Sequence, residues 1–314
     1  MKIPFERTIS GAYRFAFTNI LSIIGVGWFP FLLFGALVAG LVVLWLPQWP
    51  ELWAAFGKAA DPQTLDKTRL FVLLAPLAGS YLLVILALFV VQAMVNVGIM
   101  RKALGQHPGP VFIFFSLGSQ VWRLLGSYLL LVLLAWGVLL LFGLGIGAIA
   151  YGVGRASEPA EAVVAGILIF VAFLWFLYAA VRVTFFIPAV VVAENHIGIR
   201  RAWHLGKGNF WRILGIVLIV TLPLGMAVNV ITQSLLQMAL GPEFGGTVAT
   251  TPAETQRIFA EMLHAVGKIW PYYAALQLIS LVLQAGLTAG ASANAYRLVT
   301  GGDEIAPPPA KVPA

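Results

Sequence analysis

The chain has 314 residues, of which 61% are hydrophobic and 10% are Asp, Glu, Lys or Arg, whereas average soluble chains carry roughly 25% charged residues. So few charged side chains cannot cover the exterior of a soluble domain of this size, which excludes that class of protein. Lipid hydrocarbon, in contrast, solvates Leu, Val and Phe directly. The absence of cysteine excludes disulfide frameworks, thiolate metal sites and cysteine nucleophiles.

Six hydrophobic stretches are long enough to cross a bilayer as helices, because about 20 mainly apolar residues span roughly 30 Å of hydrocarbon. In chain order they cover about residues 20–46, 71–100, 122–151, 162–190, 213–240 and 270–297. Prolines in or near these stretches are expected to kink the helices: Pro30, Pro76, Pro188, Pro223 and Pro271. We predict an all-α, polytopic bundle of six transmembrane helices. It forms a single domain over 1–303, and a disordered cytoplasmic tail follows at 304–314.

Basic residues predict the orientation of the bundle. With the N-terminus inside, twelve of the 19 Lys and Arg residues lie on the cytoplasmic side, six lie in outer loops, and Arg182 lies within a span. This positive-inside asymmetry places both termini in the cytoplasm. The net charge of +7 therefore indicates orientation and contact with anionic headgroups. Nucleic-acid binding is not expected, because it calls for a basic patch on a folded domain or a recognisable motif.

Three similar segments each open a hydrophobic stretch: residues 19–25, 120–126 and 209–215. Each begins with an amide side chain and ends in glycine, and an aromatic residue lies six positions upstream of the amide: Tyr13, Phe114 and Trp203. Internal similarity of this kind is the mark of repeated structural units. We predict three parallel two-helix repeats, each preceded by a short amphipathic interfacial helix.

Residues 197–212 combine aromatic and basic side chains, as a helix lying in the membrane interface does. The plainer interpretation is an aromatic belt with positive-inside anchors, which needs no specific ligand. The alternative is a specific site for an anionic lipid or a partner. The candidate interfacial residues are Arg200, Arg201, Trp203, Lys207, Trp211 and Arg212.

The same region resembles a known family. Val181-Arg182, Pro188, Glu194 and the run RRAWHLGKGNFWR at 200–212 resemble the signature of the glycerophosphoryl diester phosphodiesterase membrane-domain family. Ala202 and Gly206 stand where that family often has Ser and Thr. The resemblance implies a stand-alone, multi-pass protein of the bacterial cytoplasmic (inner) membrane. It implies no phosphodiesterase activity, because six spans and short loops leave no room for the catalytic barrel.

Ionisable side chains inside a span cost about 2.5–3.5 kcal/mol at mid-helix on insertion scales, so they mark candidate functional positions. Arg182 is the only deeply placed charge in the six stretches. It can snorkel to the interface, pair with Glu194 through a helix break near Pro188, or face the bundle interior. A structural role is our first interpretation, and contact with a substrate phosphate or lipid headgroup is the alternative.

Neutral polar side chains form stripes at spacings of three or four: Gln92 and Asn96; Asn229, Gln233 and Gln237; Gln277, Ser280, Gln284 and Thr288. We expect them to face protein and form interhelical hydrogen bonds worth about 0.6 kcal/mol each. The alternative is that they line a polar cavity. Three small-residue pairs are spaced for close helix contacts: Gly143/Gly147, Gly286/Gly290 and Gly35/Ala39.

Catalytic and metal-binding motifs are missing from the sequence, which has no His-Glu-x-x-His and no Gly-x-Ser-x-Gly. We therefore expect no enzymatic activity, no cofactor and no metal. Our leading hypothesis is a non-enzymatic membrane protein whose basic, aromatic cytoplasmic rim organises anionic lipid, a membrane protein partner or a second copy of the chain. The alternative hypothesis is a transporter or permease subunit for a small or amphipathic substrate, which the polar stripes and Arg182 favour.

Overall fold

The computed structural model describes residues 2–48, 67–107, 111–155, 158–240 and 252–301, and within these ranges the chain forms helices and no strand. The predicted tail at 304–314 lies outside them. The long helices are α2 (Ile20–Trp45), α4 (Lys67–Ala103), α5 (Ser119–Gly154), α6 (Glu158–Thr184), α9 (Phe210–Leu240) and α10 (Pro252–Thr300). The short ones are α1 (Phe5–Thr18), η1 (Leu46–Gln48), α7 (Ile187–Glu194) and α8 (Ile199–Leu205).

Six helical segments of the described chain are long and apolar enough to cross a membrane. They are Ile20–Gln48, Leu74–Ala103, Ser119–Gly154, Ala160–Glu194, Phe210–Ala239 and Gly267–Thr300. Each overlaps one of the six stretches predicted from the sequence. The chain is therefore an all-helical, multi-pass membrane protein.

Two helix boundaries differ from the sequence expectation. The fourth stretch is interrupted, because α6 ends at Thr184 and α7 begins at Ile187. Proline is tolerated in the first turn of a helix but disrupts its interior, so Pro188 favours a new helix at this point. α10 begins at Pro252, well before the sixth predicted stretch at 270–297, because proline is pre-organised for the first helical position.

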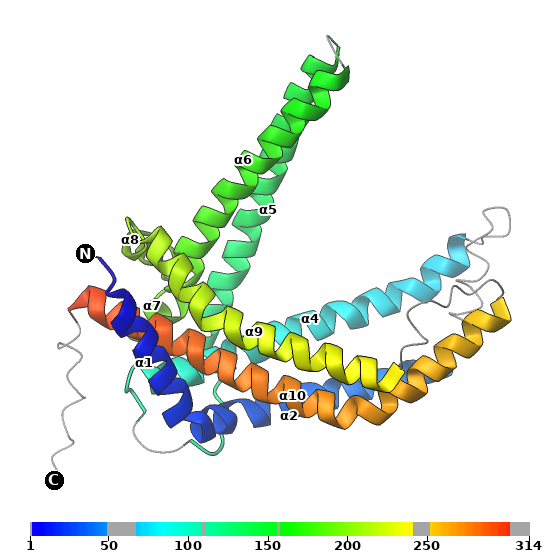
Figure 1. Ribbon diagram of the computed structural model, residues 1–314, viewed down its shortest axis with the longest axis horizontal. Coiled ribbons are helices and arrows are strands. Elements are labelled where there is room, and N and C mark those ends of the chain that lie inside the picture. Colours follow the sequence, from blue (N-terminus) through cyan, green and yellow to red (C-terminus); the bar gives the residue numbers. More distant parts are fainter. Residues whose placement is uncertain (1, 49–66, 108–110, 156–157, 241–251, 302–314) are drawn as a thin grey trace.

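The long helices pair in chain order, α2 with α4, α5 with α6 and α9 with α10. Figure 1 shows that the α5–α6 pair projects away from the other two pairs. α1 packs against α10 and α9. The first and last described residues lie at the same end of the molecule, on the left of Figure 1.

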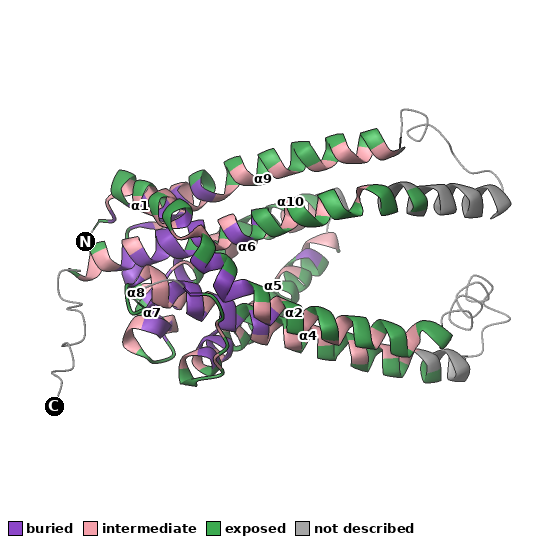
Figure 2. Ribbon diagram, turned by 90° about the horizontal axis from the view of Figure 1, so that it is seen from below, coloured by how far each residue is buried: buried purple, intermediate pink, exposed green. Residues whose placement is uncertain are grey.

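Buried residues gather at that same end, which we call the packed end (Figure 2). It consists of α1, α7, α8, the first turns of α2, α5 and α9, and the last turns of α4, α6 and α10. Away from it the helices hold large apolar side chains outward, such as Leu141 and Leu144, each 73% exposed. Such exposure in water costs roughly 25 cal/mol per Å², whereas lipid hydrocarbon removes that cost.

α7 lies at the centre of the packed end and contacts α4, α5 and α10. Five of its eight residues are buried, including Ile187 and Val190 at 0% exposure. A helix that is apolar on all sides belongs in a protein interior. The last carbonyls of a buried helix need hydrogen-bond donors from elsewhere. Gln106 and Gln120 supply them, each donating a side-chain N–H to the carbonyl of Val192.

The segment in front of α5 corrects the prediction of an interfacial helix before every pair. Helices α1 and α8 precede α2 and α9, but residues 111–118 are not helical. The carbonyl of Phe112 accepts a hydrogen bond of 2.7 Å from the Trp28 indole. The backbone of Val111 lies so close to Gly25 that a Cβ there would have no room. A helix would draw the Phe112 carbonyl into an internal hydrogen bond, so these contacts favour a non-helical chain.

One of the three small-residue pairs forms a close helix contact. A Cβ at Gly290 would lie 3.2 Å from the carbonyl oxygen of Ala12, and one at Gly286 would lie 3.3 Å from the Cβ of Ala16. These two glycines therefore let α1 approach α10 closely. Nothing lies within 4 Å of the Cβ positions of the remaining glycines, Gly35, Gly143 and Gly147.

Replacing Gly290 with Leu is expected to push α1 away from α10 and to destabilise the protein by about 1–3 kcal/mol, the usual cost of overpacking. Gly147→Leu is the matched control, because it brings the same gain in helix propensity at an open position. Thermal unfolding of the two purified variants in one detergent measures the difference. Equal unfolding midpoints would contradict the α1–α10 contact.

Candidate functional site

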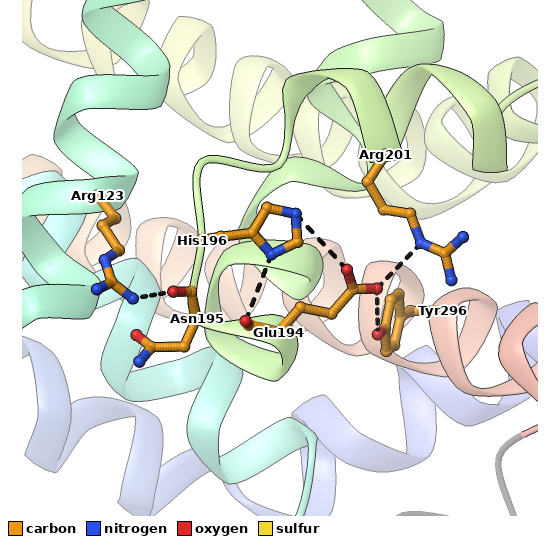
Figure 3. A network of polar contacts seen from close by, with 6 residues as sticks. All are labelled: Arg123, Glu194, Asn195, His196, Arg201 and Tyr296. Atoms are coloured by element: carbon orange, nitrogen blue, oxygen red, sulfur yellow. Dashed lines mark hydrogen bonds and ion pairs between the residues drawn. The ribbon is translucent and has the colours of Figure 1, made fainter.

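A polar network joins four helices at the packed end (Figure 3). Glu194, the last residue of α7, accepts a hydrogen bond of 2.9 Å from the Tyr296 hydroxyl and one of 3.1 Å from Arg201 Nε. The Nε2 atom of His196 lies 3.7 Å from the same carboxylate. Arg123 of α5 donates to the carbonyl of Asn195. The network therefore ties α5, α8 and α10 to the C-terminal end of α7.

Arg182 is held inside the packed end and is 6% exposed. Its Nε donates to the carbonyl of Trp203 at 3.1 Å, and its Nη1 donates to the hydroxyl of Tyr178 at 2.8 Å. The guanidinium carbon lies 4.0 Å from the centre of the Trp203 ring, a cation–π distance. Gly206 makes this approach possible, because a Cβ there would lie 2.7 Å from the Arg182 carbonyl oxygen. Arg182 therefore fastens α8 to α6.

These contacts decide between the three placements considered for Arg182. The helix does break near Pro188, yet Arg182 has no ion pair with Glu194, whose described ionic partners are Arg201 and His196. Its burial also rules out snorkelling. Arg182 faces the interior and holds Trp203 in place.

The predicted interfacial residues divide into anchored and free side chains. Arg201 is paired with Glu194, and Arg212 Nη1 donates to the carbonyl of Ile3 at 2.6 Å. Trp203 is held by Arg182. The remaining three, Arg200, Lys207 and Trp211, are exposed. Free cations at this end are therefore fewer than the sequence suggests.

The structure brings some of the polar stripe residues together and leaves others apart. Gln92 and Asn96 of α4 both line two spaces between helices, a large groove and a smaller cavity. Asn229, Gln233 and Gln284 are exposed, contrary to the expectation that the stripes face protein within the chain.

A groove of about 950 Å³ runs between α4, α5, α6 and α8. Its walls are mainly apolar, with Leu131, Val138 and Trp175 among them. Arg200 and Trp203 of α8 lie at its packed-end margin. Arg200 is the only charged side chain among the described residues that line it.

A smaller cavity of about 340 Å³ adjoins the groove and is lined by residues of α4, α5, α6, α7, α9 and α10. Four residues line both spaces and form what we call the polar wall: Gln92, Asn96, Tyr128 and Thr184. The Asn96 amide donates to the Tyr128 hydroxyl at 3.4 Å, a long hydrogen bond. The wall therefore places neutral polar groups between two interhelical spaces.

Tyr128 is a site residue that the sequence reasoning missed. The signal for it was present, because Tyr128 immediately precedes the uninterrupted apolar stretch 129–150 of α5. Tyr128 belongs to no polar stripe at helical spacing, because its polar neighbours, Gln92 and Asn96, lie on a different helix, α4.

Among the described residues, no group of three or more His, Asp or Glu side chains lies close enough together to hold a metal ion. Comparison with protein-family models, curated proteins and solved structures gave no match. The functional argument therefore depends on the geometry of the groove and the charges around it.

Removing the Arg182 side chain is expected to loosen α8 from α6. Arg182→Ala removes two charge-assisted hydrogen bonds and a cation–π contact with Trp203, so we expect a loss of about 2–4 kcal/mol. Arg182→Lys is expected to fall in between, because an ammonium cannot reproduce the fork geometry of a guanidinium.

Thermal unfolding and limited proteolysis of the purified variants measure this effect. Lys268→Ala is the control, because Lys268 is exposed and has no partner among the described residues. Its effect should stay within about 0.5 kcal/mol. An Arg182→Ala protein as stable as the parent would contradict the structural role.

Proposed function

We propose that the chain is a non-enzymatic protein of the bacterial inner membrane, with both termini in the cytoplasm, that binds anionic lipid at its packed end. One observation carries this proposal: five exposed cations at this end lack acidic partners among the described residues. These residues, which we call the basic rim, are Lys2, Arg7, Arg14, Arg200 and Lys207. Both ion pairs of the described chain involve Glu194. Each Lys or Arg near an anionic leaflet contributes about 1 kcal/mol of attraction.

The packed end also has the features of a surface that lies against headgroups. In α1 the buried residues are Thr8, Ala12 and Ala16, while Arg7 and Arg14 are exposed. We propose that α1 and α8 lie in the cytoplasmic interface, with cations toward phosphate and aromatic rings at headgroup depth.

We also propose that the bundle is built from three parallel two-helix repeats. The pairing of α2 with α4, α5 with α6 and α9 with α10 supports this. So does the position of the three amides. Asn19 and Asn209 directly precede α2 and α9, and Gln120 lies in the first turn of α5. The Asn19 amide donates to the carbonyl of Phe15, the Gln120 amide donates to the carbonyl of Val192, and the Asn209 side-chain oxygen accepts from the backbone N–H of Ile3.

A transporter or permease subunit for an amphipathic substrate is the second candidate, which the polar wall favours. A substrate entering from the bilayer would meet Gln92 and Asn96 on leaving the groove, with the inner cavity behind them. Flux of a labelled phospholipid across vesicles containing the purified protein, compared with protein-free vesicles, separates this candidate from static binding.

The lipid proposal predicts that the purified protein retains phosphatidylglycerol in preference to phosphatidylethanolamine. Replacing Arg14 and Lys207 with Gln should lower that ratio by about fivefold per charge, as follows from 1 kcal/mol each. Native mass spectrometry and lipid extraction measure the ratio.

The control is the double variant Arg155→Gln/Lys268→Gln, which removes one Arg and one Lys exposed at the opposite end. The control should leave the preference unchanged. A parent protein that is indifferent to headgroup charge would refute the proposal.

A further inference from the structure

We infer that the groove between α4, α5, α6 and α8 is a binding site for one anionic phospholipid of the cytoplasmic leaflet. The phosphate lies at Arg200, and an acyl chain lies along α5 and α6. This inference rests on the proposed function, which assigns the packed end to anionic lipid. It adds the place, the number of lipids and the depth at which the lipid is bound.

The depth of the groove matches one leaflet. On α5 the apolar stretch 129–150 begins directly after Tyr128, and on α4 the apolar run 82–91 ends directly before Gln92. Both polar residues line the groove, so they mark the level at which hydrocarbon begins. From Tyr128 to Val138, the last α5 residue of the groove, the helix rises about 15 Å at 1.5 Å per residue. That is half of the roughly 30 Å hydrocarbon core.

The margin of the groove carries free hydrogen-bond donors for an anion. Arg200 is exposed, and its guanidinium has no partner in the part of the chain that the structure describes. The indole N–H of Trp203 likewise has no acceptor among the described residues. Trp203 itself is fixed by the stacked Arg182 and by the edge of Tyr178, 6.3 Å between ring centres. No acidic side chain lines the described groove, so its charge complements a phosphate.

The walls below the margin suit an acyl chain. Ala135 on α5 and Ala179 and Ala180 on α6 line the groove, and their small side chains leave space between the two helices. Trp175 lies further along, with its ring against Phe142. A preformed space bounded by small residues can hold an acyl chain without displacing protein side chains.

The polar wall distinguishes a phospholipid from a simple hydrocarbon. The Gln92 amide has no hydrogen-bond partner among the described residues, and the Asn96–Tyr128 bond is long at 3.4 Å. These groups lie where the ester carbonyls of a glycerolipid enter the hydrocarbon. An occupant with an anionic head, polar esters and apolar chains satisfies all three regions of the site.

The test is native mass spectrometry of the full chain in mild detergent, with phosphatidylglycerol as the added probe. We expect one tightly held lipid per chain. Arg200→Gln should weaken this single adduct by about fivefold or more, the effect of removing one charge beside an anion. Arg14→Gln is the matched control, which lowers the general enrichment of anionic lipid but leaves the single adduct.

A second pair of variants tests the apolar part of the site. Ala135→Phe fills the groove and should abolish the single adduct. Ala148→Phe makes the same change on an exposed face of the same helix and should leave the adduct in place. Thermal unfolding of both variants shows whether each retains its fold. A misfolded Ala135→Phe protein would leave the Arg200→Gln measurement as the deciding one.

The outcomes separate this inference from the proposed function. If the parent prefers anionic lipid but Arg200→Gln and a folded Ala135→Phe hold phosphatidylglycerol as the parent does, the groove is not the site and the rim proposal stands. If the parent shows no headgroup preference, both fail. A dimer that carries no lipid would overturn the inference in favour of a second copy of the chain covering the groove.

Discussion

The structure depends on the bilayer as solvent for the distal parts of its long helices. In the described part of the chain the core cluster of buried residues lies at the packed end, and α7 fills its centre with residues such as Ile187 and Val190 that have no exposure. In contrast, the most apolar windows of α5 and α6 contain no buried residue. In water these surfaces would drive the helices together or into aggregates. In hydrocarbon they need no protein partner, so the α5–α6 pair can diverge from the others and leave a groove.

The same packing that holds the packed end together also shapes the candidate site. Hydrogen bonds and a cation–π contact with Trp203 and Tyr178 offset the free-energy cost of burying Arg182. The same contacts fix one wall of the groove. Glu194 takes up the charge of Arg201 and leaves its neighbour Arg200 free. A cation with a local acidic partner, such as Arg201, has a structural role, whereas a cation without one, such as Arg200, is available to a ligand. Both residues lie in the first turn of α8.

Much of the fold could be predicted from the sequence, because spanning length and apolar content are local properties. The six stretches could be identified without knowledge of neighbouring helices. The role of α7 could not be predicted in this way. In the sequence, residues 187–194 resemble the end of a span, and only the contacts with α4, α5 and α10 show that they form a buried helix. The site was predicted less well for the same reason. Gln92, Asn96, Arg200 and Trp203 were identified, but Tyr128 joins them only through contacts between helices. The non-helical segment at 111–118 depends on Trp28, more than 80 positions earlier.

The central claim is that the packed end lies at the cytoplasmic face of a membrane that the six helices cross. The chain has no cysteine, so single cysteines report position without background. Exposed positions at the two ends are available at Lys207 and Arg155. With a membrane-impermeant maleimide on intact cells, Arg155→Cys should be labelled at once, and Lys207→Cys only after the membrane is disrupted. Labelling of Lys207→Cys in intact cells, with Arg155→Cys protected, would contradict the account.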